Sequence, residues 1–305
     1  MMTEGISFMV GTASWTDPTL VKSDLFYPPS LKTAEERLRF YAEHFNTVEV
    51  DSSYYTLLSE KTAQAWASRT PPGFMFNIKA FALLTQHPAE TARLPGALKQ
   101  LLNEKEQGLT RINRPSAQVL DLAFEMFWSA LVPLREEGKL GMLLFQFPPY
   151  FVCKSANFDY LAGLRERLPQ ATLAIEFRHP SWVLEGQRRH DTMEFLRRNE
   201  LCYVSVDCPQ GPSIMPSFLE ATGAQMYVRF HGRNRESWFK KNITAAERFK
   251  YLYSERELED HAERLTRMSG VKRAYVIFNN CYSNFGVMNA TTMTQILTRP
   301  SRRAR

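Results

Sequence analysis

The chain has 305 residues, 44% of them hydrophobic and 23% charged, and its formal net charge is +6. This composition is ordinary for a globular protein, and the chain has no apolar run that could span a bilayer and no signal-like N-terminus, so we expect a cytoplasmic protein without a membrane partner. The four cysteines are too scattered for a disulfide framework or a Cys-x-x-Cys metal site.

Eight short segments alternate apolar and polar residues, which is the pattern of β-strands. In chain order they cover residues 8–14, 47–51, 74–80, 142–147, 172–178, 202–207, 225–231 and 275–280. The polar residues gather toward the C-terminal end of these segments. His179-Pro180 ends the fifth strand, because a residue before proline avoids the helical region.

Helical segments lie between the strands, and several have capping residues. Thr33 with Glu36, Thr244 with Glu247 and Ser254 with Glu257 form capping boxes. Asp191 with Glu194 predicts the start of a further helix, and Asn289 is expected to cap the last one.

The longest connection, residues 81–139, separates the third and fourth strands. It contains a predicted helix near 97–104 and a long one from about Ser116, where Pro133 must kink the helix or start a second piece. We interpret it as an insertion within a single domain of residues 1–298, because it lacks enough elements for a core of its own.

Strands that alternate with helices predict a parallel sheet. Eight such units fit a closed (β/α)8 TIM-like barrel, an α/β fold, and no glycine-rich phosphate loop follows the first strand to favour a Rossmann fold. In a barrel the C-terminal ends of the strands share one face, and that face carries the chemistry.

Several distinctive motifs are spread along the chain between about Gly11 and Leu297. They are Phe26-Tyr27-Pro28, Thr47-Val48-Glu49-Val50, Leu144-Phe145-Gln146-Phe147-Pro148-Pro149, Glu176-Phe177-Arg178-His179-Pro180-Ser181-Trp182, Arg229-Phe230-His231-Gly232-Arg233-Asn234 and Phe278-Asn279-Asn280. In these the chain resembles the YecE-like family, a domain of unknown function. The resemblance implies a TIM-like barrel and supplies no reaction. The chain departs from the family at Asp51, where Asn is usual.

Polar and aromatic residues at the strand ends are the candidate site. The candidate catalytic residues are Glu49, Glu176, Asp207 and His231. The candidate binding residues are Lys79, Gln146, Arg178, His179, Arg229, Arg233, Asn234, Asn279, Asn280, Trp15, Tyr54 and Trp182. The alternative for single pairs is a structural ion pair, Glu49 with Arg178 or Asp207 with Arg229.

Three functions are compatible with this set. A hydrolase with an anion-binding site would cleave a phosphodiester with a divalent metal, although the ligand spacing indicates no particular metal or cofactor. A metal-free acid–base enzyme would use Glu49 and Glu176 on a sugar-like molecule. A non-catalytic protein would bind nucleic acid or a phosphorylated ligand, helped by a basic tail over residues 299–305 that we expect to be disordered. The expected partner is a small or phosphate-containing ligand, or nucleic acid.

Overall fold

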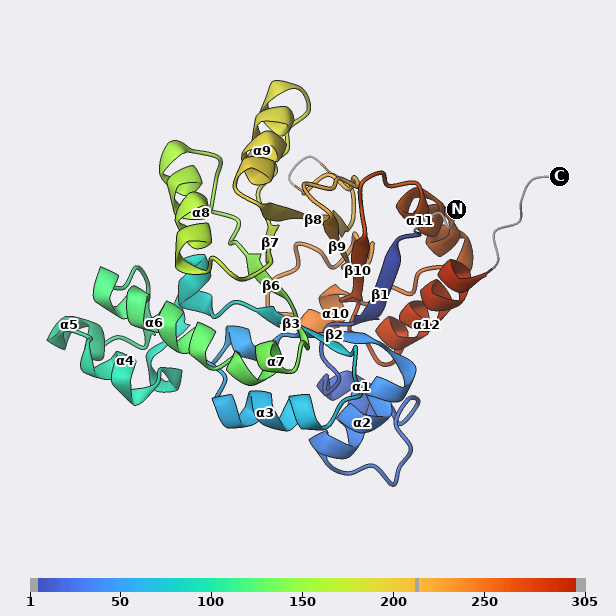
Figure 1. Ribbon diagram of the computed structural model, residues 1–305, viewed down its shortest axis with the longest axis horizontal. Coiled ribbons are helices and arrows are strands. Elements are labelled where there is room, and N and C mark those ends of the chain that lie inside the picture. The colour runs from blue at the N-terminus through green and yellow to red at the C-terminus, as the bar shows by residue number, and fades with distance from the viewer. Residues whose placement is uncertain (1–4, 212–213, 300–305) are drawn as a thin grey trace.

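The structure is a computed structural model, and it describes residues 5–211 and 214–299. Its main sheet has eight parallel strands in the order β1-β10-β9-β8-β7-β6-β3-β2. They are β1 (Ser7–Thr12), β2 (Thr47–Val50), β3 (Met75–Lys79), β6 (Leu140–Gln146), β7 (Leu173–Glu176), β8 (Leu201–Asp207), β9 (Gln225–Phe230) and β10 (Arg273–Phe278). The two end strands of this order lie side by side, so the sheet curls into a nearly closed barrel, as predicted (Figure 1).

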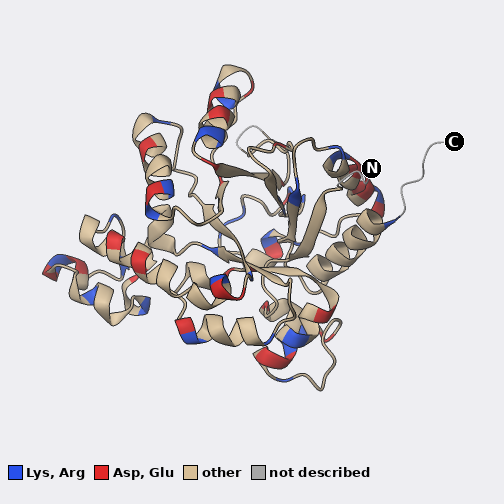
Figure 2. Cartoon of the chain, in the orientation of Figure 1, with Lys and Arg blue, Asp and Glu red and all other residues tan. Residues whose placement is uncertain are grey.

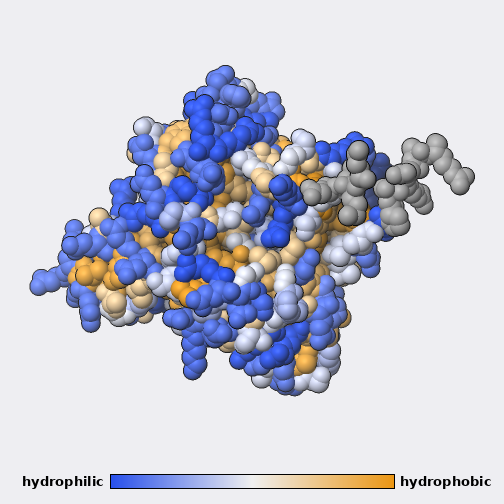
Figure 3. Space-filling model, viewed as in Figure 1, coloured by the Kyte–Doolittle hydropathy of each residue, from blue (hydrophilic) through white to orange (hydrophobic). Residues whose placement is uncertain are grey.

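Helices form the outer layer of the barrel (Figure 1). They are α1 (Pro18–Ser23), α2 (Ala34–His44), α3 (Glu60–Ser68), α8 (Ser155–Arg167), α9 (Gln187–Arg198), α11 (Glu255–Thr266) and α12 (Phe285–Thr298). The one-turn helix α10 (Ala245–Arg248) instead appears over the middle of the barrel (Figure 1). Charged residues gather on the helices (Figure 2), and on the face shown in Figure 3 apolar residues appear in the hollows between hydrophilic ones. No helix in the described part of the chain is long and apolar enough to cross a membrane.

The connection between β3 and β6 contains the short elements η2 (Ala82–Thr85), β4 (Ala89–Glu90), η3 (Thr91–Arg93), α4 (Gly96–Gln100), α5 (Glu104–Gln107) and β5 (Arg111–Ile112), followed by α6 (Ala117–Ser129) and α7 (Val132–Glu136). The helix expected near 97–104 is thus two short helices. Pro133 lies in the first turn of α7, so the long apolar segment is two helices. Proline is tolerated there because the first-turn amides have no helical partner.

The capping boxes at Thr33, Thr244 and Ser254 are confirmed. The two other predicted caps are wrong. Helix α9 begins four residues before Asp191, after Gly186 with its positive φ of 87°. Helix α12 begins at Phe285, and Asn289 lies buried within it, where its side chain bonds both backbone groups of Tyr253.

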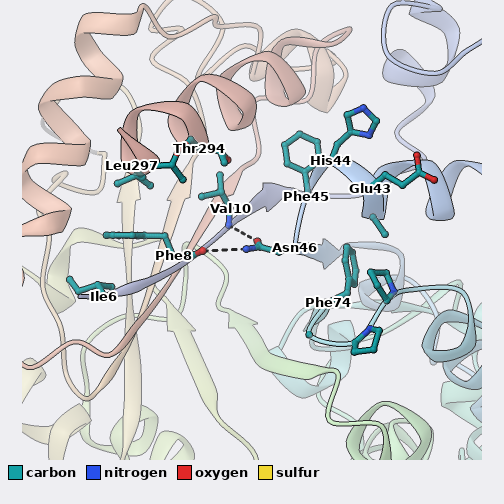
Figure 4. A pocket seen from close by; sticks show the side chains of 15 residues that line it. Ile6, Phe8, Val10, Glu43, His44, Phe45, Asn46, Phe74, Thr294 and Leu297 are labelled. Carbon is teal, nitrogen blue, oxygen red and sulfur yellow. Dashed lines mark hydrogen bonds between the residues drawn. The ribbon is translucent and has the colours of Figure 1, made fainter. Parts of the chain in front are cut away.

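The seam between β1 and β2 is closed by side chains instead of a strand ladder. Asn46 Oδ1 accepts from Val10 N at 3.0 Å and its Nδ2 donates to Phe8 O at 3.3 Å, so the amide acts as a peptide group between the strands (Figure 4). Tyr41 OH accepts from Thr12 N at 2.8 Å. Backbone pairing joins the strands only at the mouth, where Ser14 N donates to Glu49 O.

Candidate functional site

The centre of the barrel mouth is a buried ionic network around Arg229, which is 1% exposed. Arg229 Nη2 donates to Glu49 Oε1 at 2.5 Å and Nη1 donates to Glu176 Oε2 at 2.6 Å. Tyr227 OH donates to Glu49 Oε2 at 2.8 Å. The ion pairs considered from the sequence were Glu49 with Arg178 and Asp207 with Arg229. The structure instead pairs Arg229 with both Glu49 and Glu176.

Strand geometry explains why these groups meet. Side chains two residues apart share a face of a strand, so Tyr227, Arg229 and His231 of β9 and its continuation point into the barrel together. Glu49 comes from β2 and Glu176 from the end of β7. Sequence reasoning missed Tyr227, although the same alternation placed it opposite the apolar residues of its strand.

Glu176 is the most heavily bonded carboxylate of the network. Its Oε1 accepts from Gln146 Nε2 at 2.7 Å and Arg178 Nη1 at 3.1 Å, and it lies 3.1 Å from His231 Nε2. Asn279 Nδ2 lies 2.9 Å from His231 Nδ1. When the amide donates, Nδ1 accepts, and a neutral His231 carries its proton on Nε2, facing Glu176.

The two glutamates have opposite pKa shifts. Burial raises the pKa of Glu49 to about 7 even though Arg229 lowers it. Burial also opposes ionisation of Glu176, but Arg229, His231 and Arg178 together hold the pKa of its carboxyl well below its usual value. Burial lowers the pKa of His231 to about 4, so this imidazole is neutral at pH 7. Such divergent environments are typical of acid–base sites.

A second layer of charged residues lies nearer to the solvent. Asp51 and Arg178 stand two residues beyond Glu49 and Glu176, and Lys79 ends β3. Arg178 has a side chain that is 25% exposed, whereas both glutamates are fully buried. The ammonium of Lys79 lies 4.8 Å from the centre of the Tyr54 ring. The accessible part of the mouth thus presents cations above a buried network.

A cavity of about 270 Å³ opens beside this layer, between the ends of β7, β8 and β9 and the loop before α10. Arg178, His231 and Arg248 supply its polar lining, and Phe177, Met215, Trp238 and Phe239 are among its apolar walls. Arg178 lies 5.7 Å from the Trp238 ring centre. The volume of the cavity is close to the lower end of the range for small-molecule pockets.

Asp207 belongs to a different cluster from the one predicted. In the register of β8 with β9, Val206 pairs with Arg229 and Asp207 with Phe230, so Val206 faces the barrel interior and Asp207 faces outward. None of its side-chain partners belongs to the central network.

Arg233 binds both carboxylate oxygens of Asp207 at 2.8 Å, Tyr253 OH donates to Oδ1 at 2.7 Å and His261 Nε2 lies 3.1 Å from Oδ2. Burial opposes ionisation of Asp207, but hydrogen bonds from these three residues lower the pKa of its carboxyl far below its usual value. Arg233 also binds Glu257 at 2.8 Å. The cluster ties the loop after β9 to α11.

Five other predicted binding residues have structural contacts. Trp15 packs edge-on against Trp66, and Trp182 is fully buried and stacks on Phe177. His179 Nδ1 caps the short helix η4 (Pro180–Trp182). Asn234 and Asn280 donate to the backbone oxygens of Lys250 and Tyr251. The residues brought together at the mouth are Glu49, Tyr54, Lys79, Gln146, Glu176, Arg178, Arg229, His231 and Asn279.

The donor set of the mouth does not resemble a metal site. Across residues 5–211 and 214–299, no three His, Cys, Asp or Glu side chains are grouped so that they could hold a metal ion. The glutamate oxygens that a cation would use already accept hydrogen bonds from Arg229, Tyr227 and Gln146.

Comparisons with known proteins identify relatives along nearly the whole chain. Residues 9–304 match the model of a family described as protein of unknown function DUF72. The UPF0759 protein YunF of Bacillus subtilis is 31% identical over 296 residues, 94% of each chain. The structure of a DUF72 family protein from Thermotoga maritima is 32% identical, covers 95% of this chain and 99% of its own, and has a TM-score of 0.74. A DUF72 family protein from Enterococcus faecalis is 26% identical over 95% of each chain, with a TM-score of 0.76.

Proposed function

The chain belongs to the DUF72 family of proteins of unknown function, and we propose that it is a hydrolase that binds a small organic anion at the C-terminal mouth of its barrel and acts on it by metal-free acid–base chemistry. The finer assignment to the YecE-like proteins, and a cytoplasmic location, are part of this proposal.

The anchoring of Arg178 is the observation that carries the proposal. Arg178 donates to Glu176 from Nη1, the same nitrogen lies 3.3 Å from His231 Nε2, and a quarter of its side chain is exposed beside the cavity. A guanidinium held by one nitrogen keeps donors free in a fixed orientation, which suits a carboxylate or phosphate group. Arg248 adds positive charge to the lining of this cavity, and Lys79 adds another cation to the mouth at the end of β3.

Acid–base chemistry is supported by the groups next to this anion site. Hydrolysis needs a proton acceptor for the attacking water and a donor for the leaving group. Glu49, with its pKa of about 7, is assigned as the group that takes the proton of the attacking water and then passes it to the leaving group. Neutral His231 lines the cavity, and it is assigned to hydrogen-bond the leaving group from Nε2 while keeping its own proton. Glu176 stays ionised and holds Arg178, Arg229 and His231 in place.

The position of Arg229 favours this proposal over the sequence-based alternatives. Glycosidases leave space for the scissile bond between their two carboxylates, but here the Arg229 guanidinium occupies that space. Metal-assisted cleavage of a phosphodiester would first have to displace the same guanidinium from both glutamates. In the described part of the C-terminal segment, Arg299 forms ion pairs with Glu255 and Glu259, so nucleic-acid binding has no specific support from that arginine.

Binding is tested by thermal denaturation with acetate, propionate, inorganic phosphate and ethyl phosphate as probes. At least one probe is expected to raise the Tm of the wild type, and to raise that of Arg178→Gln much less. Arg256→Gln is the matched control, since Arg256 is exposed on α11. Equal shifts in Arg178→Gln and the wild type would refute the anion site.

Catalysis is tested with nitrophenyl carboxylate and phosphate esters, each with and without EDTA. Turnover is expected to persist in EDTA and to fall by about 100-fold or more in Glu49→Gln. Anion binding without turnover of any ester would favour a binding protein, and turnover abolished by EDTA would favour the metal-assisted alternative.

A further inference from the structure

The outer layer of the mouth contains two charged groups, Asp51 and Lys79, for which the described residues supply no ion pair. Val50 pairs with Ile78, so Asp51 and Lys79 stand at adjacent strand ends. Among the described residues neither forms an ion pair, and Asp51 Oδ1 is buried without a hydrogen-bond partner. A buried polar atom left in this way destabilises the unliganded site. The site therefore holds an acceptor whose donor this part of the chain does not supply.

Lys79 does not fill that role, although it is close. Its ammonium lies on the face of the Tyr54 ring, a favourable cation–π contact. Burial lowers the pKa of Lys79, and Asp51 is the largest influence that raises it, which reflects their proximity. The two charges are thus near each other but are not paired.

Asp51 and Arg178 lie on the two sides of the Arg229 bridge. Arg229 joins Glu49 of β2 to Glu176 of β7. Asp51 follows Glu49 by two residues just after β2, and Arg178 follows Glu176 by two residues just after β7. A carboxylate with an unpartnered oxygen and a partly exposed guanidinium therefore flank the same network.

We propose that the ligand of this site is zwitterionic: a small molecule with an ammonium group that binds Asp51 and a carboxylate or phosphate group that binds Arg178 and Lys79. The anionic half rests on the proposed function, and the ammonium half is new. A simple anion would leave Asp51 unpaired beside an added negative charge. A ligand ammonium would instead give Asp51 a charge-assisted hydrogen bond.

Matched probes separate the two halves of this ligand. We compare β-alanine with propionate and 2-aminoethyl phosphate with ethyl phosphate, with ethylamine alone as the cation probe, and measure affinities by calorimetry. The wild type is expected to bind at least one zwitterion about tenfold or more tightly than its anion partner, as befits a hydrogen bond to a charged group. The pair that shows this ratio identifies carboxylate or phosphate as the anionic group.

Asp51→Asn is the decisive variant. It is expected to reduce the zwitterion-to-anion affinity ratio to near one, while anion affinity stays the same or rises because a negative charge has been removed. The stability of the unliganded variant should not fall, since the wild-type oxygen has no partner to lose. Asp260→Asn, at an exposed position on α11, is the control and should keep the wild-type ratio.

The outcomes separate this inference from the proposed function. If the wild type binds anions through Arg178 but shows no preference for zwitterions, or if Asp51→Asn retains the preference, the inference is wrong and the anion site stands. If neither anions nor zwitterions bind, both proposals are wrong.

Discussion

Arg229 is the residue on which the buried charges of the barrel depend. It is the shared partner of two fully buried glutamates, one of which, Glu49, has only Tyr227 as a further donor. Removing one member of a buried ion pair leaves an uncompensated charge, which is much more costly than the pair itself is worth.

Arg229→Met is therefore expected to lower the free energy of unfolding by about 3–5 kcal/mol at neutral pH. The loss should shrink under mildly acidic conditions, because Glu49 can then become neutral. Urea denaturation at both pH values measures it, with Arg256→Met as an exposed control. A loss that is equally large at both pH values would argue that packing, and not charge, is responsible.

Glu49 provides a second test at this scale, through the pH dependence of stability. Its folded-state pKa of about 7 exceeds its ordinary value of 4.5, so the folded protein holds the proton more tightly than the unfolded chain. The resulting stabilisation is complete below the unfolded pKa and is lost as the pH rises through about 7.

The Glu49→Gln variant lacks the carboxyl group whose protonation causes this pH dependence. The unfolding free energy of the wild type relative to Glu49→Gln is therefore expected to fall between about pH 5 and pH 8, by up to roughly 1.4 kcal/mol per pH unit. Parallel stability curves for the two proteins would contradict the raised pKa.

The sequence predicted most of the residues in the network but not their pairing. Alternation places residues on strand faces, and the face that contains Glu49, Glu176 and Arg229 proved to be the interior. The same rule failed for Asp207, because Val204 and Val206 of β8 line the barrel, whereas Asp207 faces outward and contacts His261 of α11. Which face of a doubly buried strand points inward depends on its neighbours and cannot be read from alternation alone.

Among the structural elements, β1 and β2 form the least conventional junction. Gly11 is required there, because a Cβ at this position would lie 2.0 Å from Thr47 O. The close approach lets Asn46 and Tyr41 replace the missing ladder bonds. Asn46→Ala is expected to cost about 2–3 kcal/mol, since two strand backbone groups lose their partner.

Hydrogen exchange locates this effect. Protection of the Val10 amide, which donates to Asn46, should fall in Asn46→Ala, while the Ala13 amide, which donates to Phe278 O, should change much less. Asn113→Ala, at an exposed position with an ordinary backbone, is the control. Uniform loss of protection at both amides would mean that the seam does not open locally.

The helix ends also differ in how well the sequence predicts them, depending on whether the capping partner is close in sequence or comes from elsewhere in the fold. The capping boxes at Thr33, Thr244 and Ser254 satisfy neighbouring amides, so the sequence predicts them correctly. Asn289 was mistaken for a cap because the backbone groups that it bonds belong to Tyr253, 36 residues away in the sequence. The two short strands β4 and β5 were missed because two residues are too few to show a period.

At the scale of the whole molecule, the insertion shares the core of the barrel. Phe124 of α6 stacks on Phe145 of β6, α7 packs on α3, and Tyr160 of α8 donates to Leu84 O. We therefore expect a single cooperative unfolding transition. Near- and far-ultraviolet circular dichroism should give coincident melting curves, and an earlier transition confined to one signal would show that the insertion unfolds independently.

The strand order has a consequence for synthesis on the ribosome. β1 is the first strand to emerge, but its ladder partner is β10, the last, and the pairing extends from Ser7 with Arg273 to Thr12 with Phe278. Its bonds to β2 come mainly from side chains. Most chains begin to fold from their N-terminal part as they are translated, whereas here the first strand gains its backbone partner only after β10 has left the exit tunnel. The nascent barrel is therefore expected to remain an open sheet that begins at β2 until β10 can pair with β1.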